Sequence, residues 1–267
     1  MLLHAACTTN VGMKRQHNED AVLLVPEENL FIVADGMGGH ACGEVASALS
    51  VETISAFFKD TSADTERTWP FKMEKGLKYE ENRLATGIKL ANQLIYEQAQ
   101  QDIKKRGMGT TVVGMLFTHT KDHLRAYVGH CGDSRAYRFR QGNIEQLTDD
   151  HSLLNDYLKA HTLTPEEIEN FPHKNVIVRA LGMKDTVQVD IARLEPVPDD
   201  LYLLCSDGLS GMITDDEMNE IVQGYLQDPN RRDDVQGICE DLIAAANAAG
   251  GTDNVTALSV LVKSAAG

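Results

Sequence analysis

Apolar runs of strand length recur along the chain, and several of them stop at an aspartate. An apolar run that ends in a carboxylate and then breaks on a glycine is how a buried strand delivers a charge to the rim of a sheet. Four aspartates stand at such places: Asp35 after 30–34, Asp133 after 126–132, Asp207 after 201–206, and Asp253 before 255–262. We therefore expect these four carboxylates to share one site.

Two other segments have the spacing of an amphipathic helix, with apolar residues at steps of three and four. Their apolar positions are Ala48, Val51, Ile54 and Phe58 in the first, and Leu84, Ile88, Ala91, Ile95 and Ala99 in the second. The stretch 59–81 between them is rich in Thr, Lys, Glu and Asp and carries the single tryptophan, Trp69. We interpret that stretch as an exposed loop or insertion.

The remaining pattern predicts further strands and helices. Short strands are expected at 2–11 and 21–25, successive strands over 110–147, and two more at 187–194 and 201–205. The connections within 110–147 are short, which requires antiparallel neighbours. Thr214 and Glu217 form a capping box that predicts a helix start, and 235–249 has helical spacing before the last strand.

These elements predict an α+β fold rather than a doubly wound parallel sheet. The runs 30–34, 201–205 and the last strand are apolar on both faces, so each is expected to lie buried between layers. Two packed sheets covered by helices satisfy this pattern. The polar segment 151–175, with a short helix starting at Thr164-Pro165, is expected to form a mobile lid.

Composition limits the partners of such a domain. The chain has 267 residues, of which 40 are acidic and 25 basic, giving a formal net charge of −15. This charge disfavours binding to nucleic acid and to anionic membrane surfaces. The N-terminus has no signal-peptide pattern and no run approaches the roughly 18 apolar residues of a spanning helix. Five scattered cysteines fit a reducing compartment, and we expect a cytoplasmic protein.

The predicted cluster of aspartates favours a hard metal ion. Carboxylates from separate strands, with no His or Cys at ligand spacing, suit magnesium or manganese and not zinc. Two such ions roughly 3.5 to 4 Å apart can hold a water between them and give hydroxide at neutral pH. Asp35 is the natural bridge between the two ions. Arg15, close to Asp20 in sequence, could hold a phosphate through two parallel hydrogen bonds.

The chain resembles the metal-dependent type 2C (PPM) serine/threonine protein phosphatases in their compact bacterial form. The resemblance covers nearly the whole chain, 1–267, which it implies is one catalytic domain. It rests on ordered motifs: Arg15-Gln16-His17-Asn18-Glu19-Asp20, Asp35-Gly36-Met37-Gly38-Gly39-His40, Gly109-Thr110-Thr111, Gly132-Asp133-Ser134-Arg135, Arg179-Ala180-Leu181-Gly182, Ser206-Asp207-Gly208 and Gly251-Thr252-Asp253-Asn254-Val255-Thr256. It implies a central sandwich of two antiparallel β-sheets flanked by α-helices, in four layers.

The resemblance also implies roles for individual residues. Asp35 would bridge the two core metal ions, with the Gly36 carbonyl as a further ligand, while Asp207 and Asp253 would complete the other ion. Asp20 would contribute directly or through coordinated water. The other residues of the implied site are Glu19 beside Asp20, Asp133 for a possible third ion, Arg15 as the phosphate clamp, and His40 as the proton donor to the departing alkoxide.

Several of these residues have structural alternatives. An aspartate before a glycine can be a plain turn former. Arg15 could pair with Glu19 or Asp20 on the surface, which typically contributes under about 1 kcal/mol. His40 could be an exposed loop histidine, and its offset from Asp35 differs from the shorter Asp-Gly-His form of the animal enzymes.

Neighbouring residues receive structural interpretations. His130 is expected to be a buried strand residue. Ser206, like Ser134, is expected to orient neighbouring carboxylates, because the chain has no Gly-x-Ser-x-Gly motif; Asn254 belongs to the same supporting group. Cys131 and Cys205 are expected to be small buried residues. Cys42, just after His40, is the one candidate for redox chemistry.

Two classes of function remain open. The first is an active phosphatase that hydrolyses phosphoserine and phosphothreonine through a hydroxide bridging two Mg²⁺ or Mn²⁺ ions, as a monomer opposed to a Ser/Thr kinase. The second is a catalytically silent relative that binds phosphoproteins. A silent relative is expected to have lost a metal ligand or the clamp, and all are present here, which favours the enzyme. Hydrolysis of small phosphate esters is a third possibility, because the metal ions act on the phosphoryl group itself.

Overall fold

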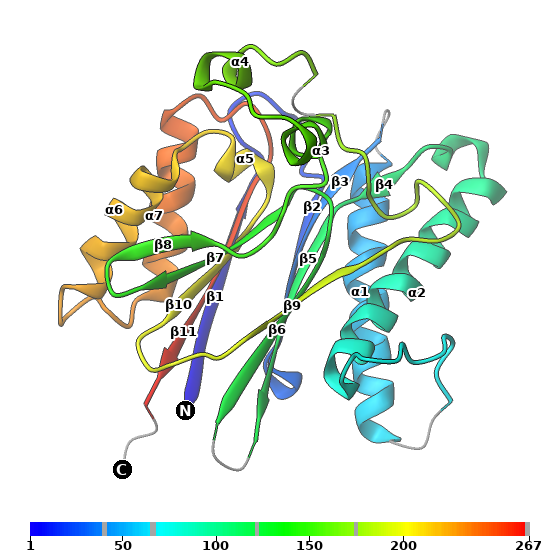
Figure 1. Cartoon of the computed structure of the whole chain (residues 1–267), viewed down its shortest axis with the longest axis horizontal. Coiled ribbons are helices and arrows are strands. Elements are labelled where there is room, and N and C mark those ends of the chain that lie inside the picture. Colours follow the sequence, from blue (N-terminus) through cyan, green and yellow to red (C-terminus); the bar gives the residue numbers. More distant parts are fainter. Residues whose placement is uncertain (39–41, 65–67, 121–122, 174–175, 265–267) are drawn as a thin grey trace.

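The computed structural model describes residues 1–38, 42–64, 68–120, 123–173 and 176–264, and these form two β-sheets that pack face to face (Figure 1). The first sheet has the strand order β1-β11-β10-β7-β8. The second has the order β2-β3-β5-β6-β9, with β4 paired to β3. Every pairing between the named strands is antiparallel.

The strands of the first sheet are β1 (Leu2–Asn10), β7 (Arg135–Arg140), β8 (Asn143–Gln146), β10 (Leu201–Cys205) and β11 (Val255–Lys263). Those of the second are β2 (Asp20–Val25), β3 (Leu30–Met37), β4 (Gly109–Thr110), β5 (Val112–His119), β6 (Leu124–Cys131) and β9 (Asp190–Leu194). The α-helices are α1 (Gly43–Ala63), α2 (Tyr79–Gln101), α3 (Leu153–Ala160), α4 (Pro165–Glu169), α5 (Asp207–Ser210), α6 (Asp215–Leu226) and α7 (Val235–Ala248). Two 3-10 helices, η1 (Pro26–Glu28) and η2 (Ile103–Lys105), complete the described elements.

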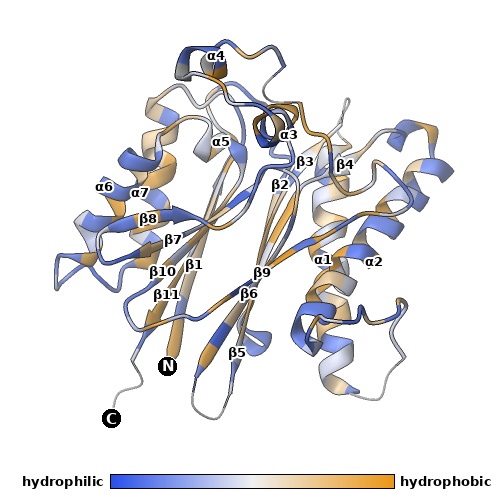
Figure 2. Ribbon diagram, viewed as in Figure 1, coloured by the Kyte–Doolittle hydropathy of each residue, from blue (hydrophilic) through white to orange (hydrophobic). Residues whose placement is uncertain are grey.

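The helices cover the outer faces of the two sheets. Figure 1 shows α1 and α2 against the second sheet and α6 and α7 against the first. Figure 2 shows the apolar residues gathered along the strands, whereas α2 and α6 carry many hydrophilic residues. The predicted α+β sandwich in four layers is therefore confirmed.

The first five residues of β3, at 30–34, are apolar at every position, and their burial shows why. Phe31 and Val33 lie in the apolar cluster between the two sheets, where β10 and β11 also contribute. The alternate residues Leu30 and Ile32 belong to the cluster under α1 and α2. Because side chains alternate across a strand, only a run without polar residues can be buried on both faces.

The predicted loop at 59–81 needs a correction. Helix α1 continues to Ala63 and α2 begins at Tyr79, so the connection is shorter than expected. Trp69 within it is partly buried, and its ring contacts those of Phe57 and Tyr79 at centroid distances of 5.6 and 5.2 Å. The tryptophan packs against the apolar cluster under the helices and is not fully exposed to solvent.

The expected lid segment carries two helices rather than one. The predicted helix start at Thr164 is correct, and its capping box begins α4. Helix α3 was not predicted, although Ser152 caps it by accepting a hydrogen bond from the Asn155 backbone N–H. The segment lies beside the ends of both sheets (Figure 1). No helix among the described residues is both long enough and apolar enough to cross a membrane.

Candidate metal and phosphate site

The two sheets bring acidic residues to one shared end. Asp20 begins β2 and lies directly opposite Asp35 of β3 in the antiparallel pair. Asp207 begins α5 immediately after β10, and Asp253 lies just before β11. Since β10 and β11 are antiparallel neighbours, the end of one lies beside the start of the other. The structure thus brings together carboxylates that the sequence separates by up to 233 positions.

Asp133 approaches this end of the sandwich from a connection between the sheets. It lies between β6, in the second sheet, and β7, in the first. The preceding Gly132 has φ +119°, and a Cβ atom there would lie 2.5 Å from the Thr111 Cβ. This position therefore requires glycine where the chain passes from β6 in one sheet to β7 in the other. Asp133 itself is 8% exposed.

The negative charges of these buried carboxylates raise one another's pKa values. Burial, followed by the charges of Asp20 and Asp207, raises the pKa of Asp35 well above its usual range. Burial also raises the pKa of Asp207, and the nearby charge of Asp253 adds to the effect. The pKa of Asp20 is raised to about 6, mainly by burial, and that of Asp133 to about 7 by burial and the charge of Asp207. Like charges held this close need a counter-charge in order to ionise together.

Two buried carboxylate oxygens of this group have no hydrogen-bond partner among the described residues. They are Oδ1 of Asp20 and Oδ1 of Asp133. A buried acceptor without a partner is destabilising by about 1–3 kcal/mol, and by more when it is charged. Oxygen ligands of this kind are what Mg²⁺ and Mn²⁺ prefer. The residues present therefore fit a divalent cation at this end of the sandwich.

The second oxygen of Asp20 is held by two hydroxyl groups. Ser206 Oγ donates to Asp20 Oδ2 at 2.8 Å, and Thr256 Oγ1 donates to the same oxygen at 2.6 Å. Ser206 Oγ also accepts from the Thr256 backbone N–H at 3.0 Å. Both hydroxyls come from the first sheet and Asp20 from the second, so these bonds connect the sheets at the acidic end. Ser206 is therefore hydrogen-bonded directly to one of the candidate metal ligands.

Asn254 fastens the loop that carries Arg15. Its side-chain amide donates to the carbonyls of Val11 and His17 at 3.0 and 2.9 Å, and its Oδ1 accepts from the Glu19 N–H at 2.8 Å. Arg15 is 50% exposed on its side chain and donates from Nη2 to Asp253 Oδ2 at 2.7 Å. The acidic partner of Arg15 is therefore Asp253, one of the candidate metal ligands, and not Glu19 or Asp20, the two partners considered from the sequence.

Glu19 lies near enough to Arg15 and Asp253 for their charges to affect its pKa, which burial raises. Its carboxylate accepts a hydrogen bond from the backbone of Gly43 at the start of α1, where an acidic side chain is favourable. Gly36 is enclosed by the backbone: a Cβ atom there would overlap the carbonyl oxygens of Gly43 and Glu19. His40, with residues 39 and 41, lies outside the described residues, and Cys42 next to them is buried.

A hollow of about 230 Å³ opens beside the acidic residues. Its lining includes Asp133 and Asp207 together with Ser152 and Leu154 of the expected lid. The segment 151–175 thus forms part of the wall next to the candidate metal ligands. A ligand in this hollow would contact the segment directly.

The comparisons with known proteins come from sequence and from structure. The profile of the family described as protein phosphatase 2C matches residues 13–242. Protein phosphatase PhpP of Streptococcus pneumoniae is 37% identical over 254 residues, which is 93% of this chain and 93% of that protein. The chain belongs to the protein phosphatase 2C family.

Solved structures agree with this assignment. The serine/threonine phosphatase PstP/Ppp of Mycobacterium tuberculosis superposes with a TM-score of 0.80 at 30% identity, covering 99% of this chain and all of that one. A second structure, the catalytic domain of the serine/threonine protein phosphatase PstP in complex with two manganese ions, has a TM-score of 0.76 at 31% identity, over 98% of this chain and 99% of that one.

In this protein phosphatase 2C chain, the sequence did not predict the contacts of two residues near the site, Thr256 and Arg135. Thr256 lies inside a recognised motif, yet its bond to Asp20 could not be seen without the strand pairing. Arg135 donates from Nε and Nη2 to the Asp150 carboxylate at 2.9 and 2.7 Å, which fixes the start of the expected lid segment. The signal was present in the sequence as an arginine directly after Asp133-Ser134, but its partner is 15 residues away.

The raised pKa values predict how metal binding depends on pH. Between about pH 4 and pH 7 the metal-free folded protein holds protons on Asp20 and Asp133 that the unfolded chain has lost, so its stability falls as pH rises. A cation must displace these protons, and its stabilising effect should grow with pH. We expect the increase in Tm caused by Mn²⁺ to be larger near pH 8 than near pH 5, as measured by differential scanning fluorimetry.

Asp20→Asn and Asp133→Asn should each flatten this pH dependence. Glu220→Gln, an exposed residue on α6, is the matched control and should leave it unchanged. A Tm increase of the same size at both ends of the pH range would contradict the assignment of these carboxylates to a metal site.

Proposed function

We propose that residues 1–267 form one phosphatase domain that hydrolyses phosphoserine and phosphothreonine in proteins with the help of Mn²⁺ or Mg²⁺. The observation that carries the proposal is the meeting of Asp20, Asp35, Asp207 and Asp253 at one end of both sheets, with Arg15 beside them. The manganese complex of the related PstP domain supports the choice of metal. A silent relative would be expected to lack part of this set.

In this proposal the carboxylates hold two core ions. Asp35 would be a ligand of both ions with the Gly36 carbonyl as a further ligand, and Asp207 and Asp253 would hold the second ion. Asp20 contributes through its unpartnered Oδ1, since its Oδ2 is already held by Ser206 and Thr256. Asp133 would hold a third ion. When bound, the ions supply Lewis-acid chemistry that makes water nucleophilic at neutral pH.

Arg15 is proposed to bind the phosphoryl group. Its guanidinium is half exposed at the rim, where a substrate can reach it, and its fork of N–H donors matches two phosphate oxygens. Asn254 contributes by holding the loop 11–19 in place. His40 is proposed to protonate the departing serine or threonine oxygen, and Glu19 to support the site from the start of α1.

The proposed partners follow from the same chemistry. Phosphoserine and phosphothreonine proteins are the substrates, and a Ser/Thr kinase would supply them. We propose a monomer in the cytoplasm that binds neither nucleic acid nor membranes; the net charge of −15 and the five free cysteines support this. The segment 151–175 is proposed to act as a lid that contributes to peptide selectivity.

The proposed function is tested by phosphate release from a phosphothreonine peptide with Mn²⁺, with Mg²⁺ and with EDTA. Asp207→Asn removes a charge from a proposed ligand with little change of shape, and it should lower the rate by at least about 100-fold. Asp228→Asn, remote from the site after α6, is the control. Equal rates in EDTA, or an Asp207→Asn variant as active as wild type, would rule out this chemistry.

The clamp is tested by Arg15→Lys, which keeps the charge and removes the paired donors. We expect the KM for the phosphopeptide to rise about tenfold, with the Mn²⁺ dependence unchanged. Arg231→Lys on the far side of the first sheet's helices is the matched control. An unchanged KM in Arg15→Lys would place the arginine outside the phosphate site.

A further inference from the structure

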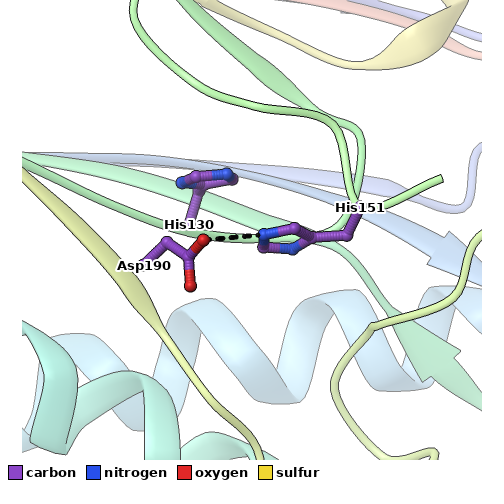
Figure 3. Close-up of side chains that lie close together, drawn as sticks. All are labelled: His130, His151 and Asp190. Atoms are coloured by element: carbon purple, nitrogen blue, oxygen red, sulfur yellow. Dashed lines mark hydrogen bonds and ion pairs between the residues drawn. The ribbon is translucent and has the colours of Figure 1, made fainter. Parts of the chain in front are cut away.

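A group of polar side chains lies next to the acidic site and has no role in the function proposed above. Among the described residues, His130 of β6, His151 at the start of the lid segment and Asp190 of β9 bring potential metal-ligand atoms within 4.8 Å of one another (Figure 3). His130 and His151 are buried. Such a group could be a second metal site or a network of hydrogen bonds.

The geometry excludes a shared metal ion in this arrangement. The rings of His130 and His151 are stacked, with centroids 4.7 Å apart and planes inclined by only 14°. An imidazole binds a metal through a lone pair in the plane of its ring, so two nearly parallel rings cannot converge on one ion. The Arg179 guanidinium also lies 3.0 Å from His151 Nε2 and donates to Asp190 Oδ1 at 2.7 Å. A cation is thus already present.

The hydrogen bonds of His151 lead instead to Gly132. The backbone N–H of Gly132 donates to the imidazole Nδ1 of His151 at 3.0 Å. The backbone N–H of His151 in turn donates to the Gly132 carbonyl at 3.0 Å. Both polar groups of the Gly132 backbone are therefore bonded to one residue. Gly132 has no side chain to fix its orientation, and the next residue along the chain is Asp133. The path of the chain after β6, and with it the position of Asp133, therefore depends on these two hydrogen bonds.

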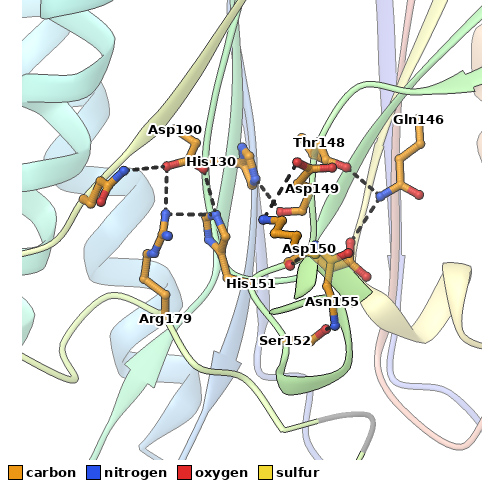
Figure 4. A network of polar contacts seen from close by, with 12 residues as sticks. His130, Gln146, Thr148, Asp149, Asp150, His151, Ser152, Asn155, Arg179 and Asp190 are labelled. Carbon is orange, nitrogen blue, oxygen red and sulfur yellow. Dashed lines mark hydrogen bonds and ion pairs between the residues drawn. The ribbon is translucent and has the colours of Figure 1, made fainter. Parts of the chain in front are cut away.

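The opposite edge of the His151 ring is anchored as well (Figure 4). Since Nδ1 accepts from Gly132, the neutral ring carries its proton on Nε2, which faces Asp190 Oδ2 at 3.2 Å. His130 stacks on the ring and donates from Nε2 to the Asp149 carbonyl at 2.9 Å. Burial and the neighbouring His130 lower the pKa of His151, which keeps the ring in its neutral form. The ring is held from three directions.

We infer that His151 is a positioning residue for Asp133. Its imidazole transmits the fixed position of Asp190 and Arg179 to the Gly132 peptide, and so aims the Asp133 carboxylate toward the acidic site. The inference rests on the proposed role of Asp133 as the ligand of a third, weaker ion. It assigns a function to a histidine that touches neither the metal ligands nor the proposed phosphate site.

Two substitutions of His151 separate positioning from a merely structural role. Asparagine can place its Oδ1 near the position of Nδ1 and still accept from the Gly132 N–H. Glutamine extends its polar group further, toward Asp190, and leaves that N–H without an acceptor. His151→Gln should therefore impair Mn²⁺ binding, whereas His151→Asn should retain most of the wild-type binding.

The readout is the number of Mn²⁺ ions bound, obtained by titration with electron paramagnetic resonance detection of free aqueous Mn²⁺. We expect His151→Gln to raise the dissociation constant of the weakest ion by about tenfold or more and to leave the tighter ions bound. His151→Asn should stay within about threefold of wild type. His161→Gln is the matched control, because His161 lies in the same segment and stacks on Tyr157 instead.

Asp133→Asn distinguishes failure of this inference from failure of the proposed function. If Asp133→Asn leaves every Mn²⁺ ion bound as in wild type, the proposed role of Asp133 is wrong. If Asp133→Asn weakens the last ion but His151→Gln does not, or if the asparagine and glutamine variants behave alike, the positioning role is wrong.

A second variant covers the case in which His151→Gln does not fold. Asp190→Asn removes the charge that orients Nε2 and leaves Gly132 and His151 intact. It should weaken the same ion in the same direction, by a smaller factor than His151→Gln. Unchanged Mn²⁺ binding in folded Asp190→Asn would then overturn the inference.

Discussion

The main physical constraint on this structure is the repulsion between carboxylates that the two sheets hold close together at one end of the sandwich. Asp20 and Asp35 are direct partners on neighbouring strands, a placement that is unfavourable for two like charges. Asp207 adds to it from the end of a strand in the other sheet, and burial together with the charges of Asp20 and Asp207 raises the pKa of Asp35 well above its usual range. A fold tolerates such a group only if something else holds it together, and a divalent cation is the partner that converts the repulsion into binding.

What holds the group together is the packing behind it. Apolar clusters lie between the sheets and under each pair of helices, so each sheet is fixed on both faces. The Phe117 and Tyr202 rings, from opposite sheets, contact each other at a centroid distance of 5.6 Å. The hydroxyl bonds from Ser206 and Thr256 to Asp20 then set the separation of the sheets at the acidic end. Rigid packing is what allows unfavourable charges to be kept at fixed positions.

Much of this arrangement could be predicted from the sequence, because it follows from strand ends. The runs 30–34 and 201–205 are apolar at every position, which indicates that they are buried on both faces and that the nearby Asp35 and Asp207 lie at the edge of the sheets. Features that depend on distant pairing could not be predicted. Nothing near Trp69 in the sequence indicates that Phe57 and Tyr79 would cover it, and the bond from the Gly132 N–H to His151 joins residues that belong to different segments. Glu19 lies next to Asp20 in sequence, yet its carboxylate turns to Gly43 because adjacent residues of an extended chain point in opposite directions.

The most direct test of the account is the position of bound manganese. Crystals grown with Mn²⁺ and measured at the manganese absorption edge give an anomalous difference map that shows each ion. We expect peaks at ligand distance from Asp35, Asp207 and Asp253, with a weaker peak beside Asp133. Peaks that avoid these carboxylates, or that lie only between His130, His151 and Asp190, would contradict it.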